Sequence, residues 1–156
     1  MSGNCPAETD RSGCLELIQQ ASTMTLGTAG AEGPWTAPVY YLYEKQGFYF
    51  FSHPESRHVQ EGENLRCAAA IFSDDPDVEK IRGIQMAGMF SRCRISRETA
   101  GIALAYSQRF HIRVGVGNVL DYFREVFHAA LYRFTPDTVF YMDNCSKFGN
   151  RRQIIL

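Results

Sequence analysis

The first half of the chain changes from a helical pattern of apolar residues to a strand-like one. Residues 9–20 carry apolar side chains at helical spacing, which predicts an amphipathic helix. The stretches 23–28 and 35–44 are strand-forming, and the Gly-rich turn 30–33 between them indicates a β-hairpin. Pro38 removes one backbone donor from the second of these strands, which therefore lies at a sheet edge or is bulged there.

The pattern continues with alternating strands and helices of different lengths. Residues 48–51 form an aromatic strand, and the next four residues, from Ser52 to Glu55, have capping-box spacing with Pro in the first turn. They predict a helix that begins at Ser52 and extends to about Arg66. We expect further strands over 67–73, 81–95, 128–134, 138–143 and 151–156, and further helices over 96–110 and within 119–127. Gly88 marks a bulge or a close backbone approach, and Pro136 joins two of the strands.

The order of these elements decides the fold class. Most strands follow one another through short turns, and helices interrupt them at three points without regular alternation, which argues against a doubly wound sheet. We predict a mostly β protein with peripheral helices (α+β), folded as an antiparallel barrel. A chain of 156 residues has the size of one domain, so a single domain over residues 1–156 is expected. Residues 1–10, rich in Gly, Asn, Pro and Thr, are expected to be flexible.

Composition and charge narrow the functional classes. A net charge of −1 argues against nucleic acid or an anionic membrane surface as a partner. The sequence contains no apolar run of about 20 residues and no secretory signal pattern after Met1, so a cytoplasmic protein is expected. The five cysteines are scattered without a CxxC pair, and the four histidines do not fall at metal-ligand spacing, so neither disulfides nor a metal site is predicted.

The strongest candidate for binding chemistry is the triplet Ser56, Arg57 and His58, which follows the aromatic strand at the start of a helix. Helix starts expose backbone N–H groups and favour anions, and these three side chains add a hydroxyl, a guanidinium and an imidazole. That set of donors suits a phosphate monoester. Plain helix capping with a solvent-exposed Arg and His is the alternative interpretation.

The paired strands 23–28 and 35–43, followed by the segment Gly47–His58, resemble the core of the pyridoxamine 5′-phosphate oxidase-like FMN-binding split barrels. The resemblance implies an antiparallel split β-barrel that binds FMN between the two subunits of a homodimer. The C-terminal third, with Tyr106–Phe110 and Arg151–Arg152, is similar to small stand-alone bacterial members of that superfamily.

The same resemblance implies a set of residues around the flavin. Ser56 and Arg57 match the Ser-Arg-Lys triplet that holds the FMN phosphate, whereas His58 stands where Lys is usual, so that contact is expected to be pH-dependent or missing. The second strand and the end of the third line the ring in this superfamily, and a later Gln reaches the phosphate region of the flavin. The C-terminal pair Arg151 and Arg152 is either solvent-exposed surface or supplies an arginine that closes a dimeric flavin site. The corresponding residues in this chain are Pro38, Val39, Phe51, Ser52, Gln85 and Arg152.

Other departures from the family pattern limit the function. Pyridoxamine-phosphate oxidases carry a C-terminal Trp and an Arg-x-His-x-Arg signature, but the only Trp here is Trp35, so oxidation of vitamin B6 is disfavoured. The expected function is an FMN-dependent oxidoreductase acting on a small molecule, with no catalytic residue assigned. A non-catalytic flavin or haem carrier or sensor is the alternative, with His111 or His128 as a candidate haem ligand. A barrel that has lost its cofactor is the third hypothesis, suggested by His58.

Overall fold

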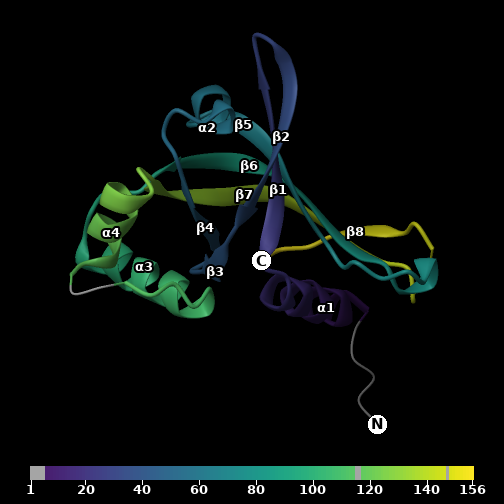
Figure 1. The fold of residues 1–156 in the computed structure, drawn as a ribbon. Helices are drawn as coiled ribbons and strands as arrows, with labels where there is room; N and C mark the ends of the chain where they lie inside the picture. Colours follow the sequence, from purple (N-terminus) through teal and green to yellow (C-terminus); the bar gives the residue numbers. More distant parts are fainter. Residues whose placement is uncertain (1–5, 115–116, 147) are drawn as a thin grey trace.

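A computed structural model describes residues 6–114, 117–146 and 148–156 (Figure 1). Within these residues, eight strands form one antiparallel sheet in the order β2-β1-β5-β6-β7-β4-β3, and β8 pairs with β7. The strands are β1 (Thr23–Gly30), β2 (Gly33–Tyr40), β3 (Leu42–Glu44), β4 (Gly47–Ser52), β5 (Arg66–Phe72), β6 (Arg82–Arg92), β7 (Ala130–Asp143) and β8 (Arg151–Gln153). The helices are α1 (Pro6–Gln20), α2 (Arg57–Gly62), α3 (Arg97–Arg109) and α4 (Val119–Val126), with a 3-10 turn at Val78–Lys80. The predicted antiparallel split-barrel fold with peripheral helices is confirmed.

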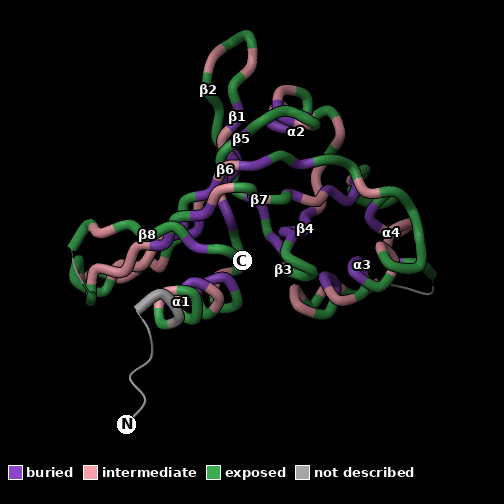
Figure 2. The backbone as a smooth tube through the Cα atoms, turned by 180° about the vertical axis from the view of Figure 1, so that it is seen from behind, coloured by how far each residue is buried: buried purple, intermediate pink, exposed green. Residues whose placement is uncertain are grey.

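The sheet is strongly curved, and the helices cover different parts of it (Figure 1). Helix α1 packs against β5, β6 and β7, and α2 packs against the β1–β2 hairpin. Helices α3 and α4 contact each other and lie beside β3 and β7. Buried and exposed residues alternate along the central strands, as the colours in Figure 2 show, so one face of the sheet is exposed.

The buried side chains form two separate clusters. The main core lies inside the curved sheet and is rich in aromatic rings, with Phe50 stacked on Tyr132 at a centroid distance of 5.6 Å and Phe90 packed edge-on to both. The second cluster joins β3, β4 and β7 to helices α3 and α4. Strand β4 contributes to both clusters because successive side chains of a strand point to opposite faces. Phe50 therefore enters the main core, and Phe51 enters the second cluster.

The edge position predicted from Pro38 is confirmed. Strand β2 is the last strand on its side of the sheet and pairs only with β1, where Pro38 lies opposite Thr25. The helix predicted from Ser96 is also confirmed. The Ser96 side chain accepts a hydrogen bond from the Thr99 amide, and the Thr99 hydroxyl accepts one from the Ser96 amide.

The helix predicted to begin at Ser52 begins instead at Arg57, with Ser56 as its N-cap, and ends at Gly62. Ser52 is the last residue of β4, and its hydroxyl turns toward His58 rather than toward the next amides. A tight turn follows the strand, in which the Ser56 amide donates to the His53 carbonyl. The capping-box prediction was wrong because strand pairing with Ala130 keeps Ser52 extended.

Residues 128–134 and 138–143 were expected to form two strands, but β7 is continuous from Ala130 to Asp143. A bulge absorbs Pro136: Gly88 lies opposite Pro136, and Ala87 lies opposite Thr138, which leaves Asp137 as the extra residue. The Asp137 carboxylate is bound by the Arg66 guanidinium from β5. The bulge predicted at Gly88 is confirmed, and it is what allows a proline inside a long strand.

The ends of the chain also differ from the expectation. Helix α1 begins at Pro6 rather than at residue 9, so part of the segment expected to be flexible is helical. Residues 1–5, 115–116 and 147 lie outside the described part of the structure. At the C-terminus, β8 is limited to Arg151–Gln153.

The close approach at the bulge makes Gly88 the most sensitive glycine of the sheet. A Cβ atom there would overlap the Thr135 carbonyl oxygen and lie 2.8 Å from Pro136 Cα. Because both neighbours are backbone atoms, we expect Gly88→Ala to lower the free energy of unfolding by about 1–3 kcal/mol, measured by urea denaturation.

Gly101 provides the matched control because it is an exposed glycine inside α3. A Cβ atom added there meets nothing within 4 Å. Gly101→Ala should therefore raise the free energy of unfolding by about 0.5–1 kcal/mol through helix propensity alone. Equal effects of the two substitutions would contradict the bulge geometry.

Candidate functional site

The candidate site lies where β4 ends and α2 begins. Ser52 Oγ is 2.8 Å from His58 Nε2 and 3.2 Å from Ser56 Oγ, and Ser56 Oγ donates to the His53 carbonyl at 2.7 Å. Three of the residues predicted to bind phosphate or line the flavin, Ser52, Ser56 and His58, are thus in direct contact. Arg57 follows Ser56 as the first residue of the helix.

Helix α2 sits close to β1 because two glycines allow it. A Cβ atom at Gly62 would lie 2.5 Å from Thr28 Cγ2, and one at Gly30 would lie 2.5 Å from the carboxyl carbon of Glu61. Val59 fills the space below the helix and belongs to the main core. The helix start is therefore fixed relative to the sheet by packing on its inner side.

The Arg57 side chain is held by three groups in this structure. Its Nε donates to Glu61 Oε1 at 2.8 Å, one helical turn later, and its NH1 lies 3.6 Å from Glu32 Oε2 in the β1–β2 turn. Its guanidinium carbon is 4.5 Å from the ring centroid of Trp35. The other oxygen of Glu61, Oε2, is buried without a hydrogen-bond partner among the described residues. Arg57 is therefore oriented, but it is also partly neutralised.

His58 differs from the expectation of a charged donor. The ring is buried, and this burial lowers the pKa of His58 below its ordinary value of 6.5. The imidazole is therefore neutral at pH 7 and is directed at Ser52. It supplies no positive charge to the cluster while the site is in this state.

The first turn of α2 offers free backbone donors. The Val59 and Gln60 amides both donate to the Ser56 carbonyl, and the Ser56 side chain makes no capping bond to the helix. The Arg57 and His58 amides have no hydrogen-bond partner among the described residues. Two amides, two hydroxyls and one guanidinium thus lie within the seven residues from Ser52 to His58, an arrangement that can bind a phosphate group.

Gln85 lies on a different surface, the outer face of the sheet. The strand register places Pro38, Thr25, Ala70, Gln85 and Phe140 side by side in one row across five strands. The next row of residues on the same face has small side chains. Phe72 and Met89, which are largely exposed, lie near it. Pro38 and Gln85, which were both predicted to be at the flavin, therefore share one exposed face.

The remaining predicted residues are distributed over other parts of the fold. Val39 is buried in the main core, so only its backbone can face a ligand. Arg152 forms an ion pair with Asp10 of α1 at 2.6 Å, whereas its neighbour Arg151 donates to Gln85 Oε1 at 3.0 Å. Arg151 is thus the C-terminal arginine that joins the outer face.

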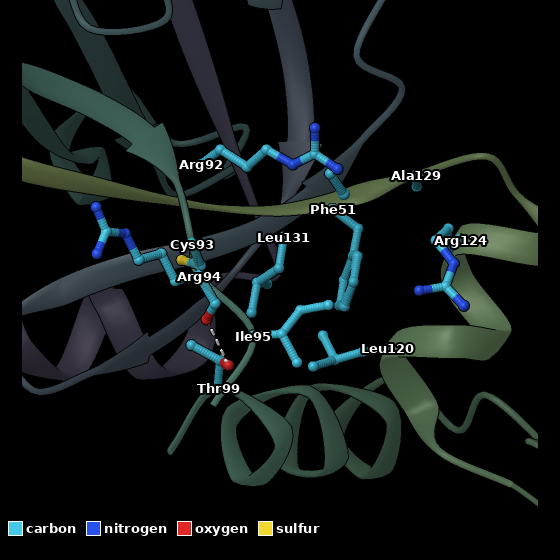
Figure 3. Close-up of a pocket in the computed structure, with 11 residues that line it drawn as sticks. Phe51, Arg92, Cys93, Arg94, Ile95, Thr99, Leu120, Arg124, Ala129 and Leu131 are labelled. Atoms are coloured by element: carbon cyan, nitrogen blue, oxygen red, sulfur yellow. Dashed lines mark hydrogen bonds between the residues drawn. The ribbon is translucent and has the colours of Figure 1, made fainter. Parts of the chain in front are cut away.

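Phe51 points away from Ser52 and into a small cleft on the opposite side of β4 (Figure 3). Its ring stacks on Phe123 of α4 with centroids 3.7 Å apart.

The residues around Arg57 that the sequence did not predict are Glu61, Glu32 and Trp35. Only Glu61 left a signal, its spacing of four residues from Arg57, because the other two approach from the separate β1–β2 hairpin.

The comparisons with known proteins agree with this fold. Residues 13–142 match the family model described as pyridoxamine 5′-phosphate oxidase. A UPF0306 protein of Cronobacter sakazakii is 28% identical over 137 residues, which cover 86% of this chain and 87% of that protein. A UPF0306 protein of Enterobacter sp. (strain 638) is 26% identical over 120 residues, covering 75% and 76% of the two chains.

Solved structures with low sequence identity share the fold. Campylobacter jejuni ChuZ has a TM-score of 0.70 at 13% identity, covering 92% of this chain, which spans 58% of the length of ChuZ. HutZ, described as the heme storage protein of Vibrio cholerae, has a TM-score of 0.67 at 16% identity, covering 84% of this chain and 93% of HutZ. An FAD binding protein of Mycobacterium smegmatis has a TM-score of 0.61 at 12% identity, covering 84% of this chain and 93% of that protein. No helix in the described part of this chain is long and apolar enough to cross a membrane.

Burial of His58 makes a prediction for stability in acid. Since the folded protein binds this proton less readily than the unfolded chain does, the free energy of unfolding is highest above pH 6.5 and falls as the pH drops through 6.5. His58→Gln should reduce this loss, measured by urea denaturation over a series of pH values. The exposed His111 is the control, and His111→Gln should retain the loss. If the His58 variant and the wild type lost stability in parallel, the assignment would be wrong.

Proposed function

Because the chain belongs to the pyridoxamine 5′-phosphate oxidase family, we propose that it binds FMN and acts as a flavin-dependent oxidoreductase on a small molecule. The observation that carries this proposal is the donor cluster at the β4–α2 junction. Ser56 and Arg57 occupy the helix start, two amides there have no hydrogen-bond partner in the described part of the chain, and Ser52 adds a second hydroxyl. In this proposal these groups hold the FMN phosphate.

The residues present fit a phosphate group in type and number. A phosphate accepts hydrogen bonds from amides, hydroxyls and guanidinium groups, and the cluster offers all three kinds. Two carboxylates, those of Glu61 and Glu32, contact Arg57, and Glu61 is already compensated by it. Glu32 is largely exposed and its contact with Arg57 is long, so a phosphate can replace it at little cost.

His58 gives this proposed phosphate site a pH dependence. The neutral ring shares a hydrogen bond with Ser52, which in turn contacts Ser56. A phosphate bound to these hydroxyls would favour the protonated ring, because an opposite charge nearby offsets the desolvation that lowers its pKa. The protein is therefore proposed to bind FMN more tightly as the pH falls, as long as it remains folded.

The bound flavin would supply the redox chemistry, and the protein would supply binding and orientation. Pro38 and the backbone of Val39, on the edge strand β2, are proposed to face the ring edge, together with Ser52 at the end of β4. Gln85 completes this proposed set. Arg151, which donates to Gln85, is proposed as the C-terminal arginine of the site in place of Arg152. We assign no general acid or base.

The outer face of the sheet supports a homodimer. It presents Thr25, Ala70, Gln85 and Phe140 in one row, and the exposed Phe72 lies close to it. An exposed face with small side chains beside exposed aromatic rings suits the close approach of an identical face about a twofold axis. In this arrangement Pro38 and Gln85 would come close to the partner subunit.

Binding of haem without turnover is the second candidate function. The solved structures of the same fold include proteins named for heme and for FAD binding, and His128 is exposed two residues before β7 begins. Its ring lies 6.4 Å from that of His53, so two imidazoles are available on one surface. The absorption spectrum of the purified protein distinguishes the two candidates. A flavin spectrum that bleaches with NAD(P)H supports the oxidoreductase, and a Soret band supports haem.

Removal of the Arg57 guanidinium tests the proposed phosphate site. Arg57→Ala should weaken FMN binding by about 1.5–3 kcal/mol, the contribution of a hydrogen bond to a charged group, in a fluorescence titration with FMN. Arg66→Ala is the control, because Arg66 is also an arginine paired with a carboxylate but lies on β5. Unchanged FMN affinity in the Arg57 variant would remove the phosphate assignment.

A charge placed on the outer face tests the homodimer. Ala70→Glu should shift the protein from the mass of two chains to that of one in analytical ultracentrifugation, because two like charges would meet at the interface. Leu104→Glu introduces the same charge at an exposed position of α3 and should leave the dimer intact. A wild-type protein that sediments as a single chain would contradict the dimer.

A further inference from the structure

We propose that the cleft beside Phe51 is a second ligand site, which binds a short-chain organic carboxylate. The cleft has a volume of about 50 Å³ and is formed by the ends of β4 and β6, the start of β7, and helices α3 and α4 (Figure 3). None of the proposed phosphate-binding residues lines it. The proposal is therefore separate from the proposed flavin site.

The inner wall of the cleft is apolar. Phe51, Leu120 and Leu131 surround the space, and Ile95 closes one side (Figure 3). The Ile95 side chain is 73% exposed, which is unusual for an isoleucine next to an apolar cleft. A ligand with an apolar end would cover this surface and gain the free energy of removing it from water.

The outer part of the cleft is positively charged. Figure 3 shows the guanidinium groups of Arg92 and Arg124 on two sides of the space, whereas the Arg94 side chain extends away from it. The Arg92 guanidinium has no hydrogen bond or ion pair to any of the described residues. Arg124 is paired with Asp121 at 2.8 Å and lies 3.4 Å from Glu125, both on its own helix, but its side chain is more than half exposed. An anionic head group is thus the complement of the rim.

Size and polarity together define the class of ligand. The cleft has about one third of the roughly 150 Å³ that accommodates benzene in a protein core, so it holds the end of a short or branched alkyl chain. The open side leaves a carboxylate between the two arginines. Guanidinium groups bind both oxygens of a carboxylate with directed, charge-assisted hydrogen bonds, whereas a neutral amide of the same shape offers one acceptor oxygen and no negative charge.

The second site differs from a redox or nucleophilic centre. Cys93 also lines the cleft, but burial raises the pKa of its thiol to about 11, so the thiol is protonated at neutral pH. Its amide is already used in a hydrogen bond to the Leu131 carbonyl. The cleft therefore offers binding without an activated side chain.

Isovalerate is the probe for this site, with isovaleramide and inorganic phosphate as comparison ligands. We expect saturable binding of isovalerate in a ligand-observed NMR titration of the full chain, and much weaker binding of the other two. Arg92→Gln and Arg124→Gln should each weaken isovalerate binding about tenfold, the effect of losing one charge-assisted hydrogen bond.

Arg94 also lines the cleft, but its side chain extends away from Arg92 and Arg124 (Figure 3). Arg94→Gln is therefore the matched control, because it removes the same charge from the same segment without removing a guanidinium from the space between them. It should change the affinity less than the other two substitutions do. The proposal is overturned if the wild type shows no saturable binding of isovalerate, if isovaleramide or phosphate binds equally well, or if Arg94→Gln weakens binding as much as Arg92→Gln. An unchanged circular dichroism spectrum of each variant shows that folding is retained.

Discussion

The antiparallel pairing of β4 with β7 is the constraint on which the rest of the structure depends. It fixes the side to which each residue of β4 points, and both buried clusters rest on that alternation. Because Phe50 is anchored in the aromatic core, Phe51 must face α4 and Ser52 must face α2. One strand end thus delivers a polar group to one surface and an apolar ring to the other. A shift of one residue in this register would exchange them.

Charge at the β4–α2 junction is balanced by partners from different parts of the chain. Arg57 is oriented by Glu61 from the same helix, and by Trp35 and Glu32 from the β1–β2 hairpin. The hairpin can provide these contacts because Gly30 and Gly62 let α2 approach β1 closely. Binding at this junction is therefore coupled to the position of the hairpin, although the two are separate elements in the sequence.

The sequence predicts the strands, their antiparallel arrangement and the edge position of Pro38, because these depend on local pattern and on one missing backbone donor. It does not predict that β7 runs through Pro136, since the bulge that permits this needs Gly88 from another strand. For the candidate site, the Ser56 and Arg57 pair was found from its place after an aromatic strand. The neutral state of His58 depends on burial, and the pairing of Gln85 with Arg151 instead of Arg152 depends on strand register. Neither is visible in a local motif.

The position of β7 in the chain has a consequence for synthesis on the ribosome. Strands β1, β2, β5 and β6 form a continuous set of pairs that needs nothing from the C-terminal third, whereas the β3–β4 hairpin joins the sheet only through β7. The nascent chain must therefore carry an aromatic hairpin without its sheet partner until residues 130–134 leave the exit tunnel. Truncated products that end before Ala130 would keep β4 and β6 with open edges, which makes them natural substrates for chaperones.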